Sequence, residues 1–85
     1  MKTIKTSRAP QAIGPYSQGK VVDNFVFTSG QIPLTVDGTL VSGDFRKEAI
    51  QVLDNIKEIL NSSGSNISNI IKLTVYLTDL SLFNI

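Results

Sequence analysis

Apolar and polar positions change their spacing several times along this chain, and each spacing predicts a different element. Residues 18–22 and 25–28 are short runs rich in valine and phenylalanine, joined at Asp23 and Asn24. Asp and Asn tolerate the positive φ that tight hairpin turns require. The two runs therefore predict a β-hairpin.

A second turn signal lies further along the chain, where Asp37 and Gly38 separate residues 34–36 from residues 39–41. Both flanking runs are short and only partly apolar. They predict either a small two-stranded arm or an irregular loop.

From residue 45 the apolar spacing becomes that of a helix. The positions that share one face are Phe45, Ala49, Val52, Leu53, Ile56 and Leu60. Asp44 suits the N-cap, and Gly64 suits the stop that follows the last turn. The opposite face carries charged residues, which is typical of a solvated surface.

From residue 69 the period becomes two, with Ile71, Leu73, Val75 and Leu77 on one side and polar or aromatic residues on the other. This pattern predicts a strand. A strand, a helix and a second strand in this order predict a right-handed crossover onto a mixed sheet. The expected class is therefore α+β, with one helical layer on a mixed β-sheet.

The last residues, 78–85, begin what resembles a capped helix that is not completed. We therefore expect the fold to be incomplete at the C-terminus. A sheet face and at least one edge would then stay uncovered and would favour association. The length of 85 residues allows one domain, close to the size at which a single core only just offsets the chain entropy.

Composition removes several kinds of chemistry. The chain has no cysteine and no histidine, so it offers neither a thiolate nor the usual proton shuttle of neutral pH. The formal net charge is only +1, which does not favour binding to a phosphate backbone. No run reaches the length of a signal peptide or a membrane span, and we expect a cytoplasmic protein with a polar, metal-free site.

Two short stretches could carry chemistry. Tyr16 follows Gly14 and Pro15, whose restricted backbone would hold the phenol in place. A tyrosine that seals a sheet edge explains this position equally well. Ser29 and Gly30 end the second hairpin strand, where a small residue and a glycine let a ligand approach the backbone. A hydroxyl that caps its own strand end is the simpler explanation.

Neither stretch resembles a nucleophile site. Ser29 lies in TSGQ, not in the GxSxG elbow, and no histidine is available to activate it. The two arginines, Arg8 on a leading tail and Arg46 on the outer helix face, are not placed to clamp a carboxylate.

Four motifs, taken together and in order, resemble the RidA/YjgF family of reactive-intermediate deaminases. They are residues 12–19 (AIGPYSQG), 27–33 (FTSGQIP), 53–57 (LDNIK) and 72–80 (KLTVYLTDL). The resemblance implies a chorismate-mutase-like fold and a homotrimer with ligand clefts between subunits. It also implies hydrolysis of 2-iminobutanoate and 2-iminopropanoate to 2-oxo acids and ammonia, with no cofactor.

The resemblance also implies roles for residues. Tyr16 matches a catalytic tyrosine that helps to place the attacking water, and Ser29 with Gly30 matches the substrate-binding serine and backbone wall. The family carries its carboxylate-binding arginine and an acidic residue in a later segment, after the helix that begins near Ser81. We therefore expect residues 1–85 to be the N-terminal two thirds of a single RidA-like domain, inactive alone.

Two other functions stay open. A non-catalytic binding or regulatory member would use the same pocket without turnover, and family members have also been labelled translation initiation inhibitor or endoribonuclease. The near-neutral charge and the absence of histidine argue against acid-base cleavage of RNA. The expected partners are a small 2-imino or 2-oxo acid and further copies of the chain, with neither nucleic acid nor membrane.

Overall fold

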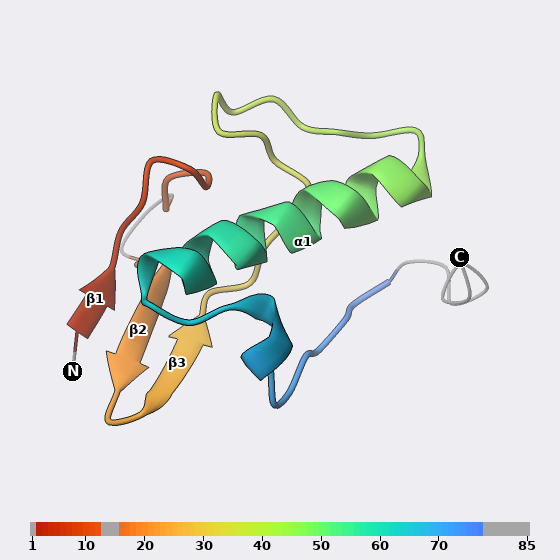
Figure 1. Cartoon of the computed structure of the whole chain (residues 1–85). Helices are drawn as coiled ribbons and strands as arrows, with labels where there is room; N and C mark the ends of the chain where they lie inside the picture. Colours follow the sequence, from red (N-terminus) through yellow and green to blue (C-terminus); the bar gives the residue numbers. More distant parts are fainter. Residues whose placement is uncertain (1, 13–15, 78–85) are drawn as a thin grey trace.

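A three-stranded antiparallel sheet lies against one long helix in the computed structural model, which describes residues 2–12 and 16–77 (Figure 1). The strands follow the order β1 (Lys2–Ile4), β2 (Gly19–Val22) and β3 (Phe25–Thr28), so β2 is central. Helix α1 (Phe45–Ser62) covers one face of the sheet, and a 3₁₀ helix, η1 (Ile67–Asn69), follows it. The α+β class is confirmed.

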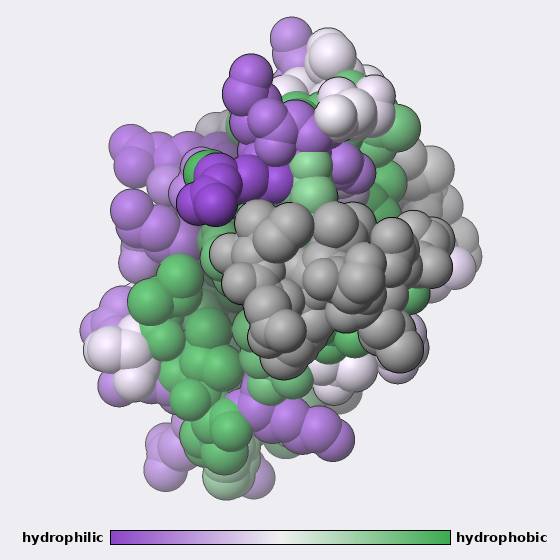
Figure 2. Space-filling model, turned by 90° about the vertical axis from the view of Figure 1, so that its right-hand side faces the viewer, coloured by the Kyte–Doolittle hydropathy of each residue, from purple (hydrophilic) through white to green (hydrophobic). Residues whose placement is uncertain are grey.

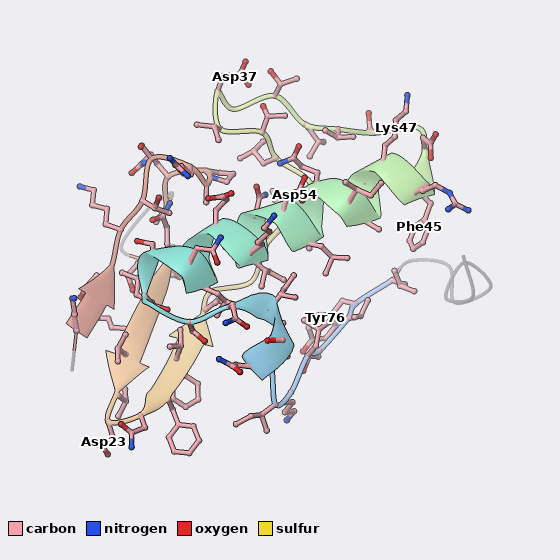
Figure 3. All side chains as sticks on the ribbon, viewed as in Figure 1. Asp23, Asp37, Phe45, Lys47, Asp54 and Tyr76 are labelled. Atoms are coloured by element: carbon pink, nitrogen blue, oxygen red, sulfur yellow. The ribbon has the colours of Figure 1, made fainter. Side chains whose placement is uncertain are left out.

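The predicted β-hairpin is present. Strands β2 and β3 pair with Val21 opposite Val26 and Val22 opposite Phe25. Asp23 takes a φ of 53°, the left-handed conformation that the turn requires, and Figure 3 places it at the tip of the hairpin.

Part of the N-terminal segment, which the sequence suggested to be a tail, forms a strand. β1 pairs antiparallel with β2, and Ile4 lies opposite Gly19. Ile4 is 4% exposed, whereas Lys2 and Thr3 are exposed. A strand of three residues with one apolar side chain is too short for its pattern to be recognised in the sequence.

Helix α1 begins and ends where the sequence predicts. The Asp44 side chain accepts hydrogen bonds from the amides of Arg46 and Lys47, at 3.0 and 3.3 Å. Gly64 takes a φ of +87° just beyond the last turn. The cap therefore satisfies two of the amides that the first turn leaves without helical partners.

The buried face of α1 is rotated from the predicted stripe. Ile56 and Leu60 are buried as expected, but Leu53 is 41% exposed, and the fully buried positions are Asn55 and Ile59. Residues 55, 56, 59 and 60 lie on one side of the helix. The face of α1 that packs against the sheet is therefore rotated slightly from the apolar stripe.

Ile59 lies at the centre of the core. It is 0% exposed and clusters with Ile4 and Ala9, while Val21 and Val26 pack against this cluster from the sheet. Full burial of one such aliphatic side chain contributes about 1.5–3 kcal/mol. The core therefore joins β1, the loop after it, the hairpin and α1.

The predicted strand over residues 71–77 is not part of the sheet in the described residues, so the sheet there is antiparallel and not mixed. Figure 1 shows an extended segment that leaves η1 and runs away from the strands. Ile71 and Tyr76 are 84% and 91% exposed. An alternating pattern predicts two faces but not a hydrogen-bonding partner. The helix expected from residue 78 lies outside the described residues.

Residues 33–41 form the small arm that was one of the two expectations. Leu34 and Leu40 form an isolated antiparallel bridge. The amide of Thr35 donates to the Thr39 carbonyl at 2.8 Å, and Val41 donates to Pro33 at 2.8 Å. Asp37 lies at the tip of this arm (Figure 3).

The exposed surface carries many apolar side chains. Figure 2 shows hydrophobic residues gathered on the lower part of the face that it views. Within the described part of the chain, no helix combines the length and the apolar character needed to cross a membrane.

Candidate functional site

A small pocket lies between the loop after β1 and the segment that leaves β3. Its volume is about 270 Å³. The described residues that line it come from both segments and carry no charge: Pro10, Gln11, Ala12, Tyr16, Gln18, Ser29, Gly30, Gln31, Ile32 and Leu34. A neutral lining of amides, hydroxyls and aliphatic groups suits a small organic molecule with both polar and apolar parts.

The three residues singled out from the sequence all line this pocket. Tyr16 is 72% exposed, so most of its ring is open to solvent. Gly14 and Pro15, which were expected to hold it rigidly, lie outside the described residues. The phenol is thus positioned at the pocket, where it is accessible to a ligand or a water molecule.

Ser29 is held by hydrogen bonds of both its hydroxyl and its backbone amide. Its hydroxyl donates to the carbonyl of Gln18 at 3.2 Å and accepts from Gln31 Nε2 at 3.2 Å. Its amide donates to the same Gln18 carbonyl at 2.9 Å. A hydroxyl whose proton goes to a backbone carbonyl has no base to activate it, so this geometry suits binding better than nucleophilic attack.

Gly30 has free space where a side chain would be. A Cβ built at this position has no heavy atom within 4 Å. Packing therefore does not require glycine here, at least against the described residues. Its effect is to leave this wall of the pocket open down to the backbone.

Gln18 joins the two walls of the pocket, and the sequence analysis did not identify it. The side chain is 3% exposed. Oε1 accepts from the Thr6 amide at 2.6 Å, and Nε2 lies within hydrogen-bond distance of the carbonyls of Thr6, Ala9 and Pro10. Since its own carbonyl holds Ser29, Gln18 connects the loop after β1 to the end of β3.

Asn55 supports the pocket from α1, and it was also not identified as a site residue. Its side chain is 1% exposed, and Nδ2 donates to the carbonyls of Ile32 and Leu34 at 3.2 and 2.9 Å. The signal in the sequence was a polar residue beside an apolar helical stripe. Such a residue must be hydrogen-bonded when it is buried.

A second hollow of about 210 Å³ adjoins the first. It shares Gln11, Ala12, Tyr16 and Gln18 with the pocket and adds Lys5, a cation. Arg8 and Arg46 belong to neither described lining, as the sequence analysis expected.

Ionisable chemistry is sparse around the pocket. In residues 2–12 and 16–77, no three acidic side chains come together as a metal would need. Hydrogen bonds from the Thr35 and Thr39 side chains, and from the Thr39 amide, lower the pKa of Asp37. It lies at the tip of the arm and not in the pocket lining.

Known proteins resemble this chain closely. Residues 6–84 match the family described as Endoribonuclease L-PSP. A RutC family protein of Pyrococcus abyssi is 45% identical over 96% of the chain and 65% of its own length. The human 2-iminobutanoate/2-iminopropanoate deaminase is 46% identical over 98% of the chain and 61% of its own length.

Comparison with a solved structure shows that the similarity extends to the fold. Escherichia coli TdcF, crystallised with bound serine, superposes with a TM-score of 0.93 at 45% identity, covering 99% of this chain and 66% of that one. The chain spans 65% and 61% of the length of the two curated relatives named above.

Proposed function

This chain belongs to the family described as Endoribonuclease L-PSP, that of the RidA/YjgF proteins, and from this premise we propose that it forms part of a 2-iminobutanoate/2-iminopropanoate deaminase. The reaction hydrolyses a reactive 2-imino acid to a 2-oxo acid and ammonia. One observation carries the proposal: Tyr16, Ser29 and Gly30 line a single small pocket with an uncharged lining in the described residues.

The proposed chemistry needs one water molecule. Its oxygen adds to the imine carbon, and its protons end on the nitrogen. The carbon–nitrogen bond then breaks, so that ammonia leaves and the 2-oxo acid remains. Tyr16 is proposed to hold the attacking water by a hydrogen bond, a role that needs the accessibility its ring has.

Ser29 is proposed to bind the imine group. A hydroxyl oxygen accepts two hydrogen bonds, and one acceptor position is taken by Gln31. The second can receive the N–H of the imine. Gly30 leaves the backbone open beside it, so a flat imino acid can lie against this wall.

The substrate carboxylate is the group for which this lining offers the weakest binding. Charge-assisted bonds to a guanidinium are worth about 1.5–3 kcal/mol each, against about 0.5–1.5 for neutral donors. The described lining offers neutral donors only. Because the chain spans 61% of the length of the human deaminase, the activity is proposed for the whole protein.

We also propose that the protein acts as a homotrimer, in the cytoplasm, with its sites between subunits. The sheet face turned away from α1 supports association. Phe25 and Phe27 on this face are 55% and 60% exposed, and they alternate with Val26, which packs toward the core. Exposed aromatic side chains side by side are typical of interaction surfaces.

The function is tested by measuring ammonia release from 2-iminobutanoate, generated in the assay by a threonine dehydratase. The protein at its natural length should accelerate this release. We expect Tyr16→Phe to lower kcat by about a hundredfold and Ser29→Ala to lower kcat/KM by about tenfold. If the wild-type protein leaves the spontaneous rate unchanged, it is not a deaminase of these substrates.

A binding module is the second candidate, and the uncharged described lining favours it. Such a protein would bind 2-oxobutanoate, seen as NMR shifts at Ser29 and Gly30, without releasing ammonia from the imine. Binding without turnover would therefore select this candidate over the enzyme.

A further inference from the structure

Asn55 is the most deeply buried polar side chain of α1. Its amide group is fully used: Nδ2 donates one hydrogen to Ile32 and the other to Leu34, and Oδ1 accepts from Gln51 Nε2 at 2.9 Å. An asparagine amide has two donors, and both go to the backbone of one short segment. The partners are 23 and 21 positions away in the sequence.

That segment has few other attachments. The amide of Leu34 donates to Ile32 within it, and Pro33 accepts from Val41 of the arm. Within the described part of the chain, Asn55 therefore makes the hydrogen bonds that join Ile32 and Leu34 to α1.

Ile32 and Leu34 also line the pocket and form its aliphatic wall on the side of the segment that leaves β3. Pro10 and Ala12 line it from the loop after β1. The carbonyls of Ile32 and Leu34 are bound by the helix, so the position of their wall depends on Asn55. Ser29 is proposed to bind the imino group, which leaves the aliphatic side chains of the lining for the alkyl side chain of a 2-imino acid.

We propose that Asn55 is a positioning residue that determines which alkyl length the pocket accepts. It fixes Ile32 and Leu34 relative to Ser29, and so fixes the space for the substrate side chain. Gln51 assists by holding the amide in the orientation in which both hydrogens face the loop. This inference rests on the proposed deaminase function and deepens it.

The variant that tests the proposal is Asn55→Asp, which keeps the shape of the side chain but removes both donors. The two carbonyls would then face a carboxylate, and the loop would be released. We expect the wild-type protein to prefer 2-iminopropanoate and 2-iminobutanoate to 2-iminohexanoate. In the variant this preference, as a ratio of kcat/KM values, should fall by about tenfold, mainly through KM.

If Asn55 only stabilised the fold, its loss would not change the preference among substrates. Ile59→Val is the matched control for this possibility. It weakens the core beneath the sheet but makes no bond to residues 32–34. It should lower activity, if at all, by the same factor for every substrate at a comparable loss of melting temperature. An equally uniform loss in Asn55→Asp would overturn the proposal.

Gln51→Met keeps the proposal testable if Asn55→Asp does not fold. It removes only the bond that orients Asn55. We expect the chain-length preference to shift in the same direction by a smaller factor. An unchanged preference in this variant would overturn the proposal.

NMR titration with 2-oxopropanoate, 2-oxobutanoate and 2-oxohexanoate distinguishes a failure of the deaminase proposal from a failure of the role proposed for Asn55. If no imine is hydrolysed but the wild-type protein binds the shorter acids more tightly, and Asn55→Asp loses this selectivity, only the deaminase function fails. Turnover with unaltered selectivity refutes only the role of Asn55. If the protein neither binds nor hydrolyses these compounds, both proposals are wrong.

Discussion

Gly30 lines the pocket and Gly19 begins β2, and a side chain would meet different surroundings at each. A Cβ at Gly19 would lie 2.9 Å from the carbonyl oxygen of Phe27 and 3.3 Å from Ile59 Cγ2. The first contact is with backbone of the neighbouring strand, which cannot rotate away. Gly30 has open space instead.

Gly19→Ala should therefore destabilise the protein by about 1–3 kcal/mol, because β2 and β3 must separate or α1 must shift. Gly30→Ala is the control and should change the free energy of unfolding by less than about 0.5 kcal/mol. Urea denaturation measures both. Equal stability of the two variants would show that the close approach at Gly19 costs nothing.

The residues of the site differ in how far the sequence could identify them. Tyr16, Ser29 and Gly30 were found through motifs, and they line one pocket; their roles are proposals. Gln18 and Asn55 act through hydrogen bonds to partners 8–12 and 21–23 positions away. Hydrogen bonds over such distances in the sequence produce no local sequence pattern. The residues that support the pocket could therefore be identified only from the three-dimensional structure.

The arm of residues 33–41 carries a carboxyl group whose pKa is shifted by its hydrogen bonds. Asp37 at its tip accepts hydrogen bonds from the side chain of Thr35 and from the amide of Thr39. These bonds favour the charged carboxylate, and they lower its pKa below the ordinary value of 3.8. Their stabilising effect is present above that value and is lost as the pH falls through the lowered pKa.

We expect the amide proton of Thr39 to shift in one titration step with a midpoint below pH 3.8. Two-dimensional NMR between pH 2 and pH 7 follows it, with the range set by the ordinary pKa of Asp. Asp37→Asn should remove the step. A step that persists in this variant would assign the titration to another group.

Local signals account for the elements that the sequence predicted correctly. The ends of α1 follow from Asp44 and Gly64, and the hairpin follows from Asp23 and its neighbour, all within a few residues of the feature they determine. The sheet partners are long-range. β1 carries one buried side chain, and the alternating residues 71–77 have no strand beside them in the described structure. The alternation of apolar and polar residues alone could not have shown that residues 71–77 lack a partner strand in the described structure.

At the scale of the whole molecule, the described residues cover the sheet on one face only. α1 and Ile59 pack on the side of Val21 and Val26, while Phe25 and Phe27 remain exposed on the other. The proposed trimer would bury such a face. Because Phe25 and Phe27 are 55% and 60% exposed, burying the remainder of the two side chains contributes about 2–3 kcal/mol per subunit.

Phe27→Glu should dissociate the proposed trimer into monomers with the fold retained. Glutamate at this position lies opposite Lys20 in the β2–β3 register, so the new charge has a cross-strand partner. Sedimentation velocity gives the mass, and circular dichroism reports the fold. Lys47→Glu, on the exposed side of α1 (Figure 3), is the control and should leave the mass unchanged. An unaltered mass in Phe27→Glu would exclude this face from the interface.

The most direct test of the central claim compares ammonia release from 2-iminobutanoate by the wild-type protein and by Gly30→Leu, both at natural length. A Cβ at this position has no heavy atom within 4 Å, so we expect the variant to fold and the rest of the leucine side chain to occupy the pocket that Gly30 lines. The account predicts rapid release by the wild-type protein and release at the spontaneous rate by the folded variant. Undiminished release by Gly30→Leu, or none by the wild-type protein, would contradict it.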